Sequence, residues 1–228
     1  MGRSIATLIL IVLFSSCSTK SEKTMVVSGT IDGLKKGTLF LQKIQDSVLT
    51  NIDSLEIRGD ASFVFEQAIE SPEIFYLYLE KADNNDINDR IVFFGEPGSI
   101  NINTSWNQFE SKAQITGSKN HEVFKEYQAM MTNFNKRDLE LAQLALAAGD
   151  SIDIDSVEGL AEQNYYNRYR YILNFGLTNP TTHVAPYVAI TDGTEANPIY
   201  LDSIYKVLPD SVANGKYGRL LKTTIDKN

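Results

Sequence analysis

Between Met25 and Thr116 the chain alternates apolar and polar residues with a period of two, interrupted by turn residues at short intervals. Alternate residues of a β-strand point to the same face, so this pattern predicts strands that are covered on one face. The clearest case is residues 62–66, where Phe63 and Phe65 share a face. The other expected strands cover residues 25–31, 38–44, 48–57, 74–79, 91–94, 100–102 and 112–116.

After Gly117 the spacing of apolar residues changes to three and four, which predicts amphipathic helices. The first helix is expected to begin at Ser118 or Asn120, either of which can cap it, and to end near Gly149. Further helices are expected over residues 157–176 and 184–190.

Two more helices are expected near the end of the chain. Asn197 followed by Pro198 is typical of a helix start, with the asparagine as cap and the proline in the first turn, and Pro209 ends that helix. The inward-facing residues are expected to be Leu201, Ile204, Tyr205 and Leu208 in this helix and Tyr217, Leu220, Leu221 and Ile225 in the last one.

These two patterns together predict an α+β fold. Residues 25–117 are expected to form a β-rich domain, an antiparallel β-sandwich or open-barrel-like meander of about eight strands. A sandwich or barrel is expected because the apolar face of each strand has to be covered. Residues 118–228 are expected to form a helical segment that packs on this domain or follows it.

The first 16 residues have a different character. Arg3 precedes an uncharged, mainly apolar run over residues 5–14, which is too short to span a bilayer as a helix but has the length of a signal-peptide core. The sequence Leu-Phe-Ser-Ser-Cys at residues 13–17 resembles a bacterial lipobox. This resemblance implies cleavage before Cys17 and attachment of lipid to its sulfur and new amine. An ordinary secretory signal is the alternative, because small residues suit that peptidase too.

With a lipobox, residues 1–16 are the lipoprotein signal peptide and residues 17–24 are a polar, lipidated tether. The lipid on Cys17 then anchors an exported protein to the membrane. Ser18 stands where an aspartate retains lipoproteins in the inner membrane under the best-studied sorting rule. The expected location is therefore the outer membrane, facing the periplasm or the cell surface.

The formal net charge of −8 argues against nucleic-acid binding, because nucleic-acid-binding proteins need basic patches. Cys17 is the only cysteine, so an intrachain disulfide cannot form and packing has to stabilise the fold. The chain has no glycine-rich phosphate loop, and no cofactor is expected. The expected partners are the membrane, through the lipid, and a protein in the periplasm or at the cell surface.

The loop at residues 83–89 is the best candidate for a cation site. Its hard oxygen donors are of the kind that calcium prefers, although Asn and Asp are also common in simple turns. The candidate ligands are Asp83, Asn85, Asp86 and Asp89. Residues 149–155 lack the alternating ligands and central glycine of an EF-hand, so a loop between helices is expected there.

No spacing typical of a catalytic site is present. His121 and His183 are the only histidines, and both are expected at surface helix ends. The tyrosines of the second helix, Tyr165, Tyr166, Tyr169 and Tyr171, are candidates for an aromatic ligand platform. Tyr165 and Tyr169 share a face four residues apart, however, which more often means packing in a core against the sheet. Residues 96–98, Glu-Pro-Gly, are expected to form a hairpin turn.

Several segments resemble a known module. The most distinctive is Phe-Phe-Gly-Glu-Pro-Gly-Ser-Ile-Asn-Ile at residues 93–102; the others are residues 29–31, 39–43, 53–54, 59–65, 72–73, 115–118, 201–205 and 217–219. Together they are similar to the uncharacterised β-rich module at the amino terminus of exported thioredoxin-like thiol:disulfide interchange lipoproteins. The resemblance covers roughly residues 25–225. In those proteins a thioredoxin-like domain with a Cys-x-x-Cys motif follows, and this sequence contains no such motif.

Thioredoxin chemistry needs two neighbouring thiols, so the redox activity of that family is not expected here. The expected function is a membrane-anchored lipoprotein that carries a non-catalytic binding or interaction module. An accessory part of a periplasmic thiol:disulfide interchange system, with the redox domain on a separate chain or missing, is the alternative. A structural lipoprotein that supports a surface complex is a third hypothesis.

Overall fold

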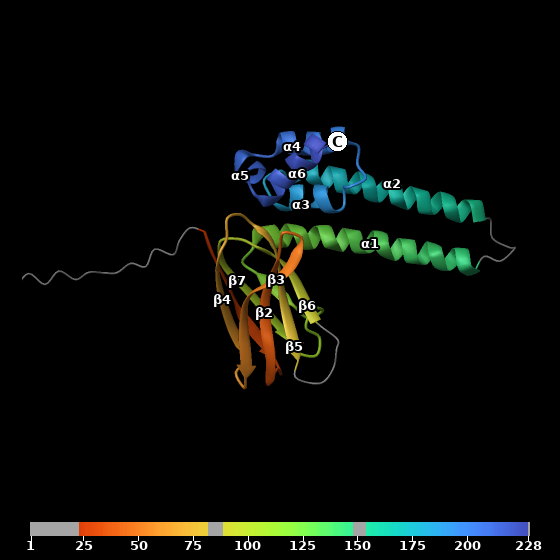
Figure 1. Ribbon diagram of the computed structural model, residues 1–228. Helices are drawn as coiled ribbons and strands as arrows, with labels where there is room; N and C mark the ends of the chain where they lie inside the picture. Colours follow the sequence, from red (N-terminus) through yellow and green to blue (C-terminus); the bar gives the residue numbers. More distant parts are fainter. Residues whose placement is uncertain (1–22, 82–88, 148–153, 228) are drawn as a thin grey trace, which may run out of the picture.

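A computed structural model describes residues 23–81, 89–147 and 154–227 (Figure 1). Its first part contains two four-stranded sheets, with strand orders β4-β1-β7-β8 and β3-β2-β5-β6, and its second part is helical. The predicted α+β class and the sandwich-like arrangement are therefore confirmed. The strands are β1 (Thr24–Asp32), β2 (Lys36–Gln45), β3 (Val48–Arg58), β4 (Ser62–Ala68), β5 (Glu73–Lys81), β6 (Asp89–Gly95), β7 (Gly98–Ser105) and β8 (Gln114–Thr116).

The inward faces of these strands form one apolar core. In β4, Phe63 and Phe65 are buried while Val64 between them is exposed, as the alternation predicts. Phe75 of β5 and Phe93 of β6 are fully buried and stack with ring centroids 5.9 Å apart. Full burial of a large apolar side chain stabilises a fold by about 1.5–3 kcal/mol, so this core is a major source of stability.

The strand order differs from the antiparallel meander that was expected. β1 pairs antiparallel with β4 but parallel with β7, where Val27 lies opposite Ile100. β6 and β7 belong to different sheets, so residues 96–97 connect the two sheets and do not form a hairpin turn. An alternating pattern identifies the residues that face the core, but it contains no information on which strand is the neighbour or on its direction.

Strands β5 and β6 are buried on both faces at one end of the sandwich. Phe75 and Phe93 point into the sandwich core, whereas Ile74 and Phe94 belong to a second cluster that they share with the helices. The helical members of this second cluster are Phe124, Tyr127, Ile172, Phe175, Val184, Val188 and Tyr217. The helices therefore pack on the sandwich through a mainly aromatic surface.

The helical segment begins with a long antiparallel pair. These two helices run side by side and extend past the edge of the sandwich, while the shorter helices gather above its other side (Figure 1). A third apolar cluster, which includes Leu201, Ile204 and Leu221, lies entirely within the helical segment. The helices are α1 (Lys119–Ala147), α2 (Ile154–Thr178), α3 (Val184–Thr191), α4 (Pro198–Val207), α5 (Asp210–Ala213) and α6 (Lys216–Lys227).

Two predicted helix starts are confirmed. Ser118 Oγ accepts a hydrogen bond from the His121 backbone N–H at 3.0 Å at the start of α1, and Asn197 Oδ1 accepts one from the Ile199 N–H at 3.0 Å at the start of α4. The first turn of α1 has an additional acceptor that was not predicted. The carboxylate of Glu96, in the connection between the sheets, accepts from the Lys119 N–H at 2.7 Å. A negative charge at this end of a helix is stabilised by the helix dipole.

Other details of the helical prediction were wrong. The short helix α5 was not expected, and Leu220, expected to face inward, is 45% exposed. Successive residues of a helix are about 100° apart, so Leu220 cannot share the face of the buried Leu221. Tyr205 is only half-buried, although Leu201 and Ile204 are buried as predicted. In the described part of the chain, no helix is both long and apolar enough to cross a bilayer.

Candidate functional site

Most of the expected site residues lie where the structure gives no description. Cys17, the candidate ligands Asp83, Asn85 and Asp86, and most of the loop at residues 149–155 lie outside the described residues. Asp89 is the first residue of β6. Within residues 23–81, 89–147 and 154–227, no three His, Cys, Asp or Glu side chains are grouped as a metal site would require.

His121 is buried, which corrects the expectation of a surface position. Its Nδ1 accepts a hydrogen bond from the Phe94 N–H at 3.4 Å, and its ring lies 6.4 Å from that of Phe124. Burial, with a smaller contribution from Lys125, lowers the pKa of His121 to about 4. The imidazole is therefore neutral at pH 7 and helps to join α1 to β6.

His183 is also buried, at the residue that precedes α3. Its backbone N–H donates to Asn120 Oδ1 at 2.8 Å, and burial lowers its pKa, while nearby Glu96 acts in the opposite direction. Its Nδ1 has no hydrogen-bond partner among the described residues. The two histidines thus both lie in the packing around the start of α1.

The tyrosines of α2 do not form a single platform. Tyr165 and Tyr166 are about half exposed, so the expectation that Tyr165 packs in a core against the sheet was wrong. Tyr165 Oη donates to Glu195 Oε2 at 2.9 Å, and this bond raises the pKa of the phenol. Tyr171 instead stacks on Tyr127 of α1, with ring centroids 5.8 Å apart. The face of α2 that carries Tyr171 therefore packs on α1.

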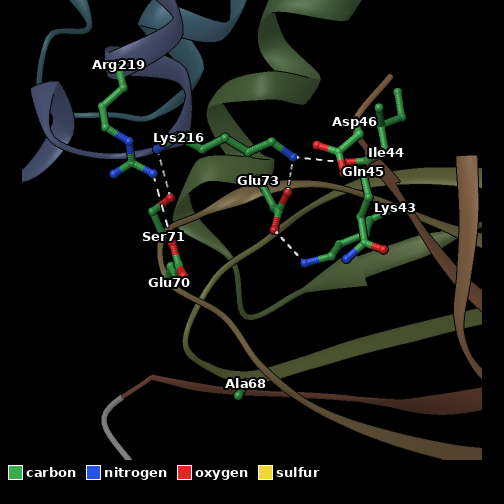
Figure 2. Close-up of a pocket in the computed structure, with 10 residues that line it drawn as sticks. All are labelled: Lys43, Ile44, Gln45, Asp46, Ala68, Glu70, Ser71, Glu73, Lys216 and Arg219. Atoms are coloured by element: carbon green, nitrogen blue, oxygen red, sulfur yellow. Dashed lines mark hydrogen bonds and ion pairs between the residues drawn. The ribbon is translucent and has the colours of Figure 1, made fainter. Parts of the chain in front are cut away.

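A polar cleft that was not predicted from the sequence lies between the sandwich and α6 and has a volume of about 550 Å³ (Figure 2). We call it the junction cleft. Its walls come from the end of β2, the connection between β4 and β5, the start of β5, and the start of α6. The lining residues are Lys43, Ile44, Gln45, Asp46, Ala68, Glu70, Ser71, Glu73, Lys216 and Arg219.

Glu73 lies at the centre of the junction cleft, and only 8% of its side chain is exposed. Its carboxylate accepts from Lys43 Nζ at 3.2 Å through one oxygen and from Lys216 Nζ through the other. Figure 2 shows the carboxylate between the two ammonium groups, with Lys216 reaching across the cleft. Two opposite charges compensate the cost of burying this carboxylate, which would be high if it were unpaired.

Neighbouring contacts hold α6 in place at the cleft. Lys216 Nζ also donates to the Ile44 carbonyl at 3.1 Å, and the Lys216 backbone N–H donates to Ser71 Oγ at 3.0 Å. The next residue, Tyr217, accepts from the Ile74 N–H at 2.9 Å through its hydroxyl oxygen. Burial raises the pKa of Tyr217, so the phenol is neutral at ordinary pH. The start of α6, at residues 216–217, is thus hydrogen-bonded to the segment at residues 71–74.

The rim of the cleft is more exposed. Arg219 Nη2 lies 3.9 Å from Glu70 Oε2, and the side chains are 60% and 90% exposed. Asp46 belongs to the two-residue turn between β2 and β3, where Asp46 and Ser47 both have positive φ, 48° and 68°. Positive φ at both central residues is the geometry of a type I′ turn, which matches the twist of the strands that it joins.

The junction cleft is suited to holding a ligand. A general base needs a carboxylate that is free to accept a proton, whereas both oxygens of Glu73 accept hydrogen bonds from lysine ammonium groups. Its lysines and Arg219 offer several N–H donors around an open volume. No sequence motif pointed to this group, because Glu73 is 143 residues from Lys216 and only the fold brings the two together.

Comparisons with known proteins match part of the chain to one family model. Residues 25–124 match the family model of a domain of unknown function, DUF4369, so the chain contains this domain. The match covers the eight strands and the first turns of α1. Lys43 and Glu73 of the junction cleft lie within it, whereas Lys216 and Arg219 lie outside. No curated protein and no solved structure matches the chain.

Proposed function

We propose that this protein is an exported, lipid-anchored lipoprotein whose folded part is a non-catalytic binding or interaction module. The lipid on Cys17 holds it to the membrane, and residues 18–24 form a polar tether between the anchor and the sandwich. The proposed location is the outer membrane, with the module facing the periplasm or the cell surface.

The observation that carries this proposal is the junction cleft. It is open, has a volume of about 550 Å³, and is lined by polar and charged groups from both the sandwich and α6. Small-molecule sites commonly have volumes of about 300–1,000 Å³ with a few polar groups that fix orientation. Its one buried carboxylate, on Glu73, is engaged by Lys43 and Lys216, which favours binding over acid–base chemistry.

The anchor can be tested separately from the module. Cells that express the full chain should incorporate a palmitate analogue into this protein, and Cys17→Ala should abolish the label. Ser16→Ala is a matched control, because it changes a neighbouring small residue and keeps the thiol. If the Cys17→Ala protein is still labelled, or the wild type is not, the lipid anchor is disproved.

Binding should be tested with the purified protein against metabolite and glycan libraries, together with pull-downs from cell envelopes. We expect a ligand or partner whose capture is reduced by Lys216→Gln, which alters the junction cleft, and unaffected by Arg58→Gln on the exposed face of β3. Conversion of any library compound to a product by the purified wild type would contradict the proposal of a non-catalytic module.

A second candidate is an accessory part of a thiol:disulfide interchange system. It is favoured by the resemblance at residues 93–102, which fall within the DUF4369 match. In this case a separate thioredoxin-like protein supplies the two thiols. Crosslinking in cells should then capture a protein with a Cys-x-x-Cys motif, and the coding sequence beyond Asn228 should be read for such a domain. If neither is found, this candidate loses its support.

A further inference from the structure

The inner, half-buried layer of the junction cleft has an excess of positive charge. Lys43 and Lys216 are 18% and 31% exposed, and the carboxylate of Glu73, 8% exposed, is the negative group between them. Two ammonium groups and one carboxylate leave a net charge of +1 in this layer. The whole chain, by contrast, has a net charge of −8, so the layer is unusual for this molecule.

The two lysines also have hydrogen-bonding capacity to spare. An ammonium group has three N–H donors. Lys216 Nζ donates to Glu73 and to the Ile44 carbonyl, and Lys43 Nζ donates to Glu73. Within the described residues, this leaves one donor of Lys216 and two of Lys43 without a protein acceptor, and both residues line the cleft.

The geometry points to an oxyanion-binding site in the junction cleft, and this inference rests on the proposed binding function. Lys43 and Lys216 bind the carboxylate or phosphate group of a small molecule, and Arg219 contacts the same group or its neighbour from the rim. Oxyanions accept charge-assisted hydrogen bonds from such donors, and these are stronger than bonds between neutral groups. The partial positive charge at the start of α6, where Lys216 lies, acts in the same direction.

The carboxylates at the rim do not cancel this preference. Glu70 is 90% exposed, and Asp46 is exposed at its turn, so water and salt screen both charges. Glu70 is also 3.9 Å from Arg219, a distance at which an exposed pair is weakly held. An incoming anion can therefore compete with Glu70 for the guanidinium group.

The test is isothermal titration calorimetry of the full chain in dodecyl maltoside, with sodium phosphate and sodium acetate as probes and sodium chloride keeping the ionic strength constant. We expect saturable binding of at least one probe. Arg219→Gln should weaken it about threefold, the size of an exposed charge contact. Glu73→Gln should tighten it by a similar factor, because it removes the buried negative charge beside the anion.

Arg58→Gln is the matched control for Arg219→Gln, since Arg58 is also an exposed arginine in an ion pair, with Glu56, but lies on β3 away from the cleft. It should leave the affinity unchanged. If Glu73→Gln fails to fold, the exposed Arg219 variant still decides the question. The inference is overturned if neither probe binds saturably, or if Arg219→Gln and Arg58→Gln alter affinity equally.

The test of the oxyanion site can fail without the proposed function failing, and the reverse also holds. A library ligand that contains no carboxylate or phosphate and depends on the cleft would overturn the oxyanion site while leaving a binding module. Turnover of a substrate would instead contradict the non-catalytic function, whatever the phosphate and acetate titrations show.

Discussion

The interior of the sandwich and the junction between the sandwich and the helices are built differently. Between the sheets, the core consists of apolar side chains such as Phe75, Leu77 and Phe93, which are fully buried. At the junction, an aromatic cluster around Phe94 is surrounded by buried or half-buried polar groups, including Glu73 and His121. The core between the sheets is apolar, whereas the junction also contains charged groups, such as Glu73 with Lys43 and Lys216.

This difference indicates what each region contributes. Apolar burial stabilises without direction, so many arrangements of similar volume would satisfy it. Hydrogen bonds and ion pairs at the junction have defined partners, such as Tyr217 Oη with the Ile74 N–H. A misplaced α6 would leave those groups buried without partners, which costs about 1–3 kcal/mol for each group. We infer that the sandwich core mainly stabilises the fold and that the junction mainly orients the helices.

The largest effect is expected from a change in the sandwich core. Phe75→Ala removes a fully buried ring that stacks on Phe93, and it should lower the free energy of unfolding by about 3–5 kcal/mol. Urea denaturation followed by circular dichroism measures this. Val64→Ala, at a side chain that is 65% exposed, is the control and should change stability little. A loss below about 1 kcal/mol at Phe75 would refute the assignment of this core as the main stabilising region.

The next effect is a pH dependence that arises at the junction. The pKa of His121 is about 4 in the folded protein, against an ordinary value of 6.5. Between these values the unfolded chain binds a proton that the folded protein does not, so stability should fall as the pH is lowered through this window. The loss should be at most about 3 kcal/mol, judged from the difference between the two pKa values.

Urea denaturation between pH 7 and pH 4 measures this dependence, and His121→Gln should flatten it. Some slope should remain in the variant, because burial also lowers the pKa of His183. A variant with the same slope as the wild type would show that His121 does not titrate in this way.

A smaller effect is expected from one hydroxyl group. Tyr217→Phe leaves the Ile74 N–H without its acceptor and should cost about 1–2 kcal/mol. Hydrogen exchange should accelerate at the Ile74 amide more than at amides in the sandwich core, because the change loosens the junction first. Tyr200→Phe, on a side chain that is half exposed, is the matched control. Uniform acceleration throughout the sandwich would contradict the separation of the two regions.

The smallest effect is expected from an ion pair on the surface. Arg58→Gln breaks a contact of 2.7 Å with Glu56, but both side chains are more than half exposed. Exposed pairs contribute little, so the free energy of unfolding should change by less than about 0.5 kcal/mol. Lys216→Gln, which alters the pair with buried Glu73, should cost clearly more in the same assay. Equal losses would mean that burial does not distinguish the junction charges from those on the surface.

Features that depend on residues close together in the chain were predicted from the sequence, whereas features that depend on distant residues were not. The alternation in β4 and the cap of α4 at Asn197 depend on neighbours in the chain, and both were predicted. The burial of His121 depends on Phe94, 27 residues away in a strand, and was not. The parallel pairing of β1 with β7 was missed for the same reason, because the pattern of one strand does not identify its partner.

The junction cleft could not be predicted from the sequence. Lys43, Glu73 and Lys216 are ordinary charged residues in unremarkable local contexts, and neither a motif nor a spacing connects them. The expected cation loop and Cys17 lie outside the described residues, so the ligand assignment at 83–89 and the lipid anchor stay predictions.

By itself, the sequence determined the elements: strands from Met25 to Thr116, helices after Gly117, and the faces that most of them bury. These follow from backbone geometry, which repeats every two or 3.6 residues and acts over one or two turns. Only the tertiary structure decided which strands pair, that both histidines are buried, and that Lys216 meets Glu73. These features depend on contacts between segments that are distant in the sequence, and such contacts are set by how the surfaces of the folded elements pack together.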